Sequence, residues 1–214
     1  MKKINKLFTA LFICSVLFTS CNSDDLDPSL EQSKSVEGSI VSVSDLEGII
    51  KGAYNEMTAA GWYGRDFIVN NEVRSDNAFS NGNSGRFTTQ ASFAYTANSG
   101  FILDDAYQAI AIANIIIATD VSTLEGDLAY GSHIQGQAYA VRALAHFDML
   151  KHYGQQHSGG TLGVPYVTEF KGSDLFPARN TIVENISSIY ADLDMAYSNM
   201  NNSYFDSTRE FMSK

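Results

Sequence analysis

Apolar side chains recur at every third or fourth position in four stretches of the chain, which is the spacing of a helix that buries one face. The stretches cover residues 44–60, 102–119, 127–153 and 181–200. No stretch between them alternates apolar and polar residues with equal strength, as a half-buried strand would. The pattern therefore predicts a mainly all-α domain built from four amphipathic helices.

The predicted helices carry recognisable start and stop signals. Ser44 with Glu47, and Thr181 with Glu184, have the spacing of a capping box, in which a hydroxyl and a carboxylate satisfy free backbone N–H groups at the helix start. Glycine commonly follows a helix end, so Gly61 is the predicted stop of the first helix.

Two of the helices have apolar faces that define the expected core. On the third helix, the residues predicted to be buried are Ala138, Val141, Ala145 and Met149. On the fourth helix, the predicted buried face consists of Val183, Ile186, Tyr190, Leu193, Tyr197 and Met200. We expect these two faces to pack against neighbouring helices.

The segment between the first two helices, residues 61–100, is rich in Asn, Ser, Gly and Thr. It also carries seven aromatic residues: Trp62, Tyr63, Phe67, Phe79, Phe87, Phe93 and Tyr95. So long a loop is usually functional or disordered, and so many rings argue against disorder. Rings beside Asn, Asp and Arg groups suit a neutral sugar, which stacks on aromatic faces and hydrogen-bonds through its hydroxyls. The alternative is that these rings pack the loop onto the helices.

The first residues of the chain predict an export signal. Three lysines precede an apolar run from Leu7 to Phe18, which would be about 18 Å long as a helix, too short for a hydrocarbon core of about 30 Å. The run ends in small residues followed by Cys21, which is similar to a lipobox. We expect cleavage of residues 1–20, lipidation of Cys21, and a flexible tether over residues 21–43. Ordinary cleavage that leaves a free thiol is the alternative.

The chain is acidic, with a formal net charge of −10 that becomes −13 when the three signal lysines are removed. Such a surface argues against binding nucleic acid or anionic lipid. Cys14 would leave with the signal, so the processed chain has one cysteine and its fold must be held by its core. Membrane attachment is therefore expected through the lipid alone.

Groups suited to catalysis or metal binding are few. The four histidines are His133, His146, His152 and His157. Their spacing matches no recognised metal site, so packing or surface roles are expected. Asp104 with Asp105, and Asp192 with Asp194, are pairs of the kind that glycosidases use, but neighbouring helical positions diverge. Arg142, the one charge expected to be buried, should form a structural ion pair. No catalytic residue, cofactor or metal is predicted.

Several short motifs follow one another in a fixed order. The first are Leu46-x5-Gly52-Ala53-Tyr54, Ser75-Asp76-Asn77 and Tyr107-x2-Ile110-x2-Ala113-Asn114. The most specific are Ala138-x2-Val141-Arg142-Ala143-x3-Phe147-x2-Leu150-x2-Tyr153-Gly154 and Gly163-Val164-Pro165. The last is Ile189-Tyr190-Ala191-Asp192-Leu193-x2-Ala196. In this order, and behind a lipoprotein start, the motifs resemble the N-terminal half of the SusD/RagB family.

The resemblance implies an outer-membrane lipoprotein of Bacteroidota that faces the cell exterior and is built on tetratricopeptide-like helix pairs. It implies capture of oligosaccharides and their delivery to a SusC-like TonB-dependent transporter, without enzymatic activity. Members of the family are much longer, so residues 44–214 are expected to be an incomplete SusD-like helical domain. The resemblance assigns sugar binding to Asp76, Asn77 and Arg86 as hydrogen-bonding groups, and to Tyr95 and Phe101 as stacking faces.

Two other classes of function stay open. A helical-repeat scaffold that binds only protein would have no affinity for glycans, and the rings of residues 61–100 could be removed without loss of its binding. A glycosidase would lose turnover when one carboxylate of a catalytic pair is removed.

Overall fold

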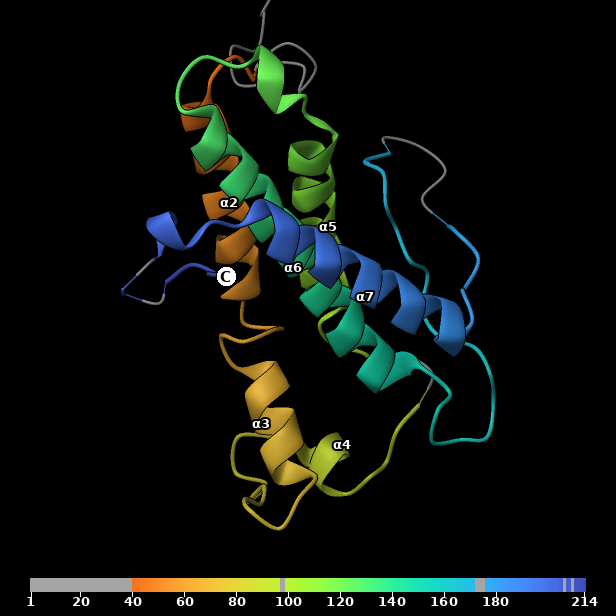
Figure 1. Cartoon of the computed structure of the whole chain (residues 1–214). Helices are drawn as coiled ribbons and strands as arrows, with labels where there is room; N and C mark the ends of the chain where they lie inside the picture. Colours follow the sequence, from red (N-terminus) through yellow and green to blue (C-terminus); the bar gives the residue numbers. More distant parts are fainter. Residues whose placement is uncertain (1–39, 97–98, 172–175, 206, 209) are drawn as a thin grey trace, which may run out of the picture. The chain divides into compact units, whose positions relative to one another are not determined.

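The computed structural model describes residues 40–214 except 97–98, 172–175, 206 and 209. The predicted signal, Cys21 and the tether up to residue 39 therefore lie outside the described residues. Within the described part, the α-helices are α2 (Val43–Met57), α3 (Asp66–Val73), α4 (Thr88–Ala91), α5 (Leu103–Ala118), α6 (Leu128–Tyr153) and α7 (Ile182–Asn199) (Figure 1). This part contains isolated bridges in place of strands, which confirms the predicted all-α class.

The central helix is α6, which packs against α2, α5 and α7, while α2 also packs against α5. Its predicted face is confirmed, since Ala138, Val141, Ala145 and Met149 are all fully buried. Helix α7 lies across α6 (Figure 1) and approaches it closely at Gly136, where a Cβ atom would lie 2.8 Å from Cγ of Met200. None of the described helices is both long and apolar enough to cross a membrane.

The start of α2 differs from the prediction. The capping box is formed by Ser42 and Asp45, whose carboxylate accepts the Ser42 N–H at 2.9 Å, and not by Ser44 and Glu47. Glu47 instead forms an i,i+4 ion pair with Lys51 on the surface. Both serine–acid pairs have the three-residue spacing, so the spacing alone could not decide between them. Residues 40–43 consequently belong to the folded unit, since the helix begins at Val43.

The end of α2 and the segment after it also differ from the prediction. The helix ends at Met57, four residues before Gly61. Gly61 lies against Asp105 instead: a Cβ atom there would lie 2.3 Å from Oδ2 of Asp105, so that the carboxylate would have to move. The expected irregular loop contains two short helices, α3 and α4, which pack against each other.

The predicted buried face of α7 is wrong except at its end. Val183, Tyr190 and Tyr197 are 77%, 65% and 67% exposed, and Ile186 and Leu193 are exposed as well. We call these five residues the α7 stripe. The helix instead buries Asn185, Ile189, Asp192 and Ala196, followed by Met200. Two of these residues are polar because their partners are polar: Asp192 pairs with Arg142 of α6, and Asn185 binds the backbone groups of Val164. The spacing of apolar residues does not reveal such pairs.

Candidate functional site

Four of the five predicted sugar-binding residues are exposed on the α3–α4 segment, residues 61–101. Asp76 and Asn77 lie in the turn after α3, and Arg86 lies shortly before α4. Tyr95, which follows α4, is 44% exposed. Because α3 packs on α4, the chain segments that carry these residues lie in one region of the fold (Figure 1). Their role in binding stays a prediction.

Phe101, the fifth predicted residue, has a different environment. It is partly buried against the core, with its ring 5.1 Å from that of His152 in an edge-to-face contact. The guanidinium of Arg74 lies 5.7 Å from its ring centroid. The structure therefore does not place Phe101 on the same exposed surface as the other four residues.

The aromatic residues of the α3–α4 segment divide into two groups. Phe79 and Phe93 are 84% and 63% exposed, and the Phe93 ring meets Tyr95 edge to face at 6.4 Å. Trp62, in contrast, is fully buried, and Phe67 packs against the core. The packing interpretation therefore holds for Trp62 and Phe67, while the rings of Phe79 and Phe93 are exposed and their binding of a sugar stays a prediction.

A buried carboxylate fixes the start of this segment to α6. Asp148 accepts hydrogen bonds from Nε1 of Trp62 at 3.0 Å and from the hydroxyl of Tyr63 at 2.5 Å. The two rings stack, with centroids 5.2 Å apart. Burial raises the pKa of Asp148, while both hydrogen bonds oppose that rise. The two hydrogen bonds offset the free-energy cost of burying this carboxylate.

The far end of the segment is fixed to the same helix. The backbone N–H of Phe101 donates to the hydroxyl of Tyr153 at 2.7 Å, and that hydroxyl donates to the carbonyl of Phe101. His152 lies between the rings of Phe67 and Phe101. Burial and, to a smaller extent, the nearby cations of Arg74 and Lys151 lower the pKa of His152 to about 4, so this contact is made by a neutral imidazole at neutral pH.

A second polar cluster joins α5, α6 and α7. Arg142 donates from Nε and Nη2 to the two carboxylate oxygens of Asp192, at 2.7 and 2.6 Å, which confirms the predicted ion pair. The remaining nitrogen, Nη1, donates to Oδ1 of Asn114 at 2.8 Å, and the Tyr166 hydroxyl donates to Asp192 at 2.6 Å. Arg142 is not the only buried charge, since Asp148 and Asp192 are 4% and 5% exposed.

This cluster extends to an irregular piece of backbone, which we call the 164–168 segment. Side chains from several elements bind its backbone groups. Three backbone N–H groups donate: that of Val164 to Asn185, that of Tyr166 to Asn180, and that of Val167 to His146. Four carbonyls accept: that of Val164 from Asn185, that of Pro165 from Tyr107, that of Val167 from Asn114, and that of Thr168 from Arg142. The distances run from 2.7 to 3.4 Å. Such bonds satisfy backbone groups that a strand or helix would otherwise pair.

His146 has a defined protonation state in this arrangement. Its Nδ1 faces the carbonyl of Arg142 at 2.9 Å, and its Nε2 accepts the N–H of Val167 at 3.1 Å. The imidazole is therefore neutral with its proton on Nδ1. Burial lowers its pKa to about 4, in agreement with that state. This buried histidine has the packing role expected from the sequence.

The members of each carboxylate pair lie in different environments. Asp192 is occupied by Arg142, whereas Asp194 is exposed on the other side of the helix. Asp104 is exposed, and Asp105 is a partly buried neighbour whose pKa is raised by burial. Among the described residues, no group of three or more His, Cys, Asp and Glu side chains is arranged to hold a metal ion.

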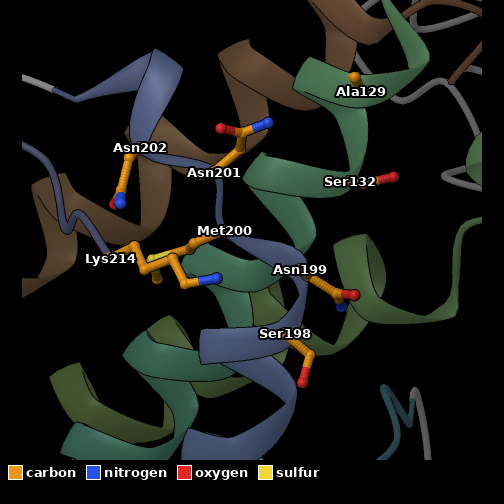
Figure 2. Close-up of a pocket in the computed structure, with 8 residues that line it drawn as sticks. All are labelled: Ala129, Ser132, Ser198, Asn199, Met200, Asn201, Asn202 and Lys214. Carbon is orange, nitrogen blue, oxygen red and sulfur yellow. The ribbon is translucent and has the colours of Figure 1, made fainter.

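A polar pocket of about 530 Å³ lies where α7 ends beside the first turns of α6 (Figure 2). Its lining residues are Ala129, Ser132, Ser198, Asn199, Met200, Asn201, Asn202 and Lys214. Asn201 already accepts the N–H of Ser203. The pocket has no aromatic lining residue, so it lacks the stacking face that a sugar needs.

Comparison with known proteins agrees with the helical architecture. A SusD-like family profile, described as starch-binding and associating with the outer membrane, matches residues 25–213. The chain belongs to this SusD-like family. A SusD superfamily protein and a putative sugar binding protein, both from Bacteroides vulgatus, have similar crystal structures. They are 26% and 28% identical to the chain, with TM-scores of 0.67 and 0.63.

The SusD-like chain is shorter than these proteins. Each match covers 76% of this chain but 38% of the other. A laminarin binding SusD-like protein shares the fold at 18% identity, with a TM-score of 0.64 and coverage of 81% and 37%. No curated protein is similar enough to match. Sequence reasoning found the family, but it did not single out the 164–168 segment. The Gly163-Val164-Pro165 motif was the one signal that pointed to it.

Proposed function

We propose that this chain is part of a surface lipoprotein that captures oligosaccharides and delivers them to a SusC-like TonB-dependent transporter. Membership of the SusD-like family supports carbohydrate binding, and the family profile associates such proteins with the outer membrane. The protein binds its ligand without cleaving it, and it needs no cofactor. Lipidated Cys21 attaches it to the membrane, so that binding takes place close to the transporter.

The observation that carries the proposal is the composition of the exposed surface of the α3–α4 segment. It presents the rings of Phe79, Phe93 and Tyr95 together with polar groups of Asp76 and Arg86. Aromatic faces and planar hydrogen-bonding groups are complementary to the two kinds of surface that a neutral sugar offers. The segment is attached to α6 at both ends, which holds these groups in place without burying them.

Affinity electrophoresis tests the proposal. The purified protein is run through gels that contain starch, laminarin or other neutral polysaccharides, with reducing ends assayed in parallel. We expect retardation by at least one polysaccharide, no new reducing ends, and loss of retardation in Asp76→Ala and Tyr95→Ala. Tyr190→Ala is the matched control, because Tyr190 is a similarly exposed tyrosine on α7. A folded, helical sample that no polysaccharide retards would contradict glycan capture by this chain.

The anchor needs its own test. Cys21→Ala should move the protein from the membrane fraction to the soluble fraction and abolish incorporation of labelled palmitate. A serine variant of Cys14 is the control, because the predicted signal carries that cysteine away. Membrane association that persists without Cys21 would contradict lipid anchoring.

The α7 stripe favours a second candidate function, a scaffold that binds protein. Its five apolar side chains, spaced alternately three and four residues apart, are all exposed along one face of the helix. A partner helix could use such a face as in a coiled-coil seam. If the scaffold is the main function, Tyr190→Ala should weaken capture of the transporter and Tyr95→Ala should not.

A further inference from the structure

A cleft of about 900 Å³ lies between α5 and the residues that follow Val164. We call it the α5 cleft. One wall is formed by Tyr107 and Gln108 of α5, and the other by Tyr166, Thr168 and Phe170. Its volume is within the range of clefts that hold small organic ligands, roughly 300–1,000 Å³. None of the sugar-binding residues predicted from the sequence lines it.

The second wall of the α5 cleft is held rigidly. Its residues Tyr166 and Thr168 belong to the 164–168 segment, whose backbone groups are bound by side chains instead of by a neighbouring strand, and Phe170 lies just beyond that segment. Three of those side chains, Asn114, His146 and Asn185, are at most 1% exposed. Buried polar networks are costly unless every member is satisfied, and a satisfied one fixes a unique geometry. This network keeps the cleft wall in one position before any ligand arrives, which lowers the entropic cost of binding.

The two tyrosines of the cleft have their hydroxyls bonded, which leaves their rings for a ligand, and one face of the Tyr166 ring is stacked on His146 at 3.8 Å. The Tyr107 hydroxyl donates to the carbonyl of Pro165 at 3.0 Å, and the Tyr166 hydroxyl donates to Asp192 at 2.6 Å. Burial raises the pKa of Tyr107 to about 12 and also raises that of Tyr166, so both remain neutral. Phe170, 53% exposed, adds a third ring. The cleft therefore has aromatic faces suited to the C–H groups of a pyranose.

Polar groups at the cleft define which ligands it accepts. Asp104 and Gln108 lie one turn apart on α5, and Glu169 lines the opposite side. Lys171 also lines the cleft, but its amine is 3.9 Å from Glu169, which offsets its charge. With two carboxylates and one amine, the rim is acidic. Carboxylates accept hydrogen bonds from sugar hydroxyls, and the Gln108 amide can both accept and donate them, while the acidic rim repels anionic polymers.

We propose that the α5 cleft is a second glycan subsite, selective for neutral over anionic oligosaccharides and separate from the exposed surface of the α3–α4 segment. This inference rests on the proposed function, because it names a further place where the same class of ligand binds. The rings of Tyr107, Tyr166 and Phe170 stack on the sugar, and Gln108 and Asp104 bind its hydroxyls.

Variants of exposed cleft residues test the subsite without disturbing the core. Phe170→Ala and Gln108→Ala are compared with Tyr190→Ala, which lies outside the cleft, by affinity electrophoresis on the neutral polysaccharide that retards the unmodified protein. Phe170→Ala should weaken the affinity roughly five- to tenfold, as expected for the loss of one stacking ring. Tyr190→Ala should have the affinity of the unmodified protein, and a polyuronate should retard none of them.

The outcomes separate the subsite from the proposed function. If the neutral polysaccharide binds but both cleft variants keep full affinity, the subsite is overturned and capture on the α3–α4 segment stands. If the polyuronate binds as well as the neutral polymer, the proposed selectivity is overturned. If no polysaccharide binds a folded sample, the proposed function and the subsite are overturned together. Circular dichroism of each variant confirms that a loss of affinity is not a loss of fold.

Discussion

The α3–α4 segment and the 164–168 segment are both attached to α6, but they are held in opposite ways. The 164–168 segment is bound along its length by buried side chains from three helices. Much of the α3–α4 segment relies on local bonds, such as those from the N–H of Asn83 to Asn81 and from the N–H of Arg86 to Ser84. The hydrogen bonds that join it to α6 lie at its two ends, and Phe67 of α3 adds an apolar contact with the core.

The difference shows how one fold can combine a fixed and an adaptable surface segment, both of which we propose to bind glycan. A segment whose bonds all run to the core can move only if the core is disturbed. A segment with local bonds can adjust its exposed side chains while its ends stay in place. Binding residues are commonly found on loops that a rigid scaffold positions, and this molecule has one loop of each kind.

The largest effect should follow from breaking the network behind the rigid segment. Arg142→Met leaves the carboxylate of Asp192 buried without its ion-pair partner, so we expect a loss of about 3–5 kcal/mol in the free energy of unfolding. Urea unfolding measures it. The double variant Arg142→Met/Asp192→Leu removes both charges and should recover most of the loss. A single variant as stable as the unmodified protein would show that the network does not hold the segment.

Acid should act on the same network. The pKa of His146 is about 4 in the folded protein and 6.5 when exposed, so the unfolded state binds a proton that the folded state excludes between these values. Stability is therefore complete above pH 6.5 and falls as the pH drops towards 4, by about 3 kcal/mol from this group. Thermal unfolding across this range should show the fall. His146→Gln should make the fall about half as steep, because His152, whose pKa is also lowered to about 4, keeps its own contribution, and an unchanged slope would contradict the prediction.

Removing the bonds of Asp148 at the start of the α3–α4 segment should have an effect on stability that is intermediate in size and confined to that segment. Asp148→Ala leaves the indole N–H of buried Trp62 without an acceptor, at a cost of about 1–3 kcal/mol. Limited proteolysis should then cut within residues 61–101 faster than in the unmodified protein, with α6 and α7 still protected. The same cleavage rate in both proteins would place the attachment of this segment elsewhere.

The smallest effect on stability is expected at the exposed rings. Phe79 is 84% exposed, so Phe79→Ala should change the free energy of unfolding by no more than about 0.5 kcal/mol. Fully buried Ile110 provides the contrast, because Ile110→Ala should cost about 2–5 kcal/mol. If Phe79→Ala proved as costly as Ile110→Ala, the ring would be packing the segment and would not be free for a ligand.

Local and periodic signals predicted part of the fold, although the first capping box, the end of α2 and the buried face of α7 were wrong. The box of Thr181 and Glu184 and the buried face of α6 were both confirmed. Arg142 was predicted to be paired because a charge on an apolar face must be compensated. The buried face of α7 could not be predicted, since Asn185 and Asp192 are buried by partners 21 and 50 residues away. The wall of the α5 cleft depends on the same long-range bonds.

The attachment of Trp62 to Asp148 has a practical consequence. Trp62 is the single tryptophan of the chain, and it is fully buried with its N–H bonded. Its fluorescence therefore comes from one known place, where the α3–α4 segment meets α6. Emission at short wavelength reports that the Trp62 ring is buried against α6, and a shift to longer wavelength reports that water has reached the ring. The protein thus carries an intrinsic optical probe of the contact between this segment and α6, and the probe needs no added label.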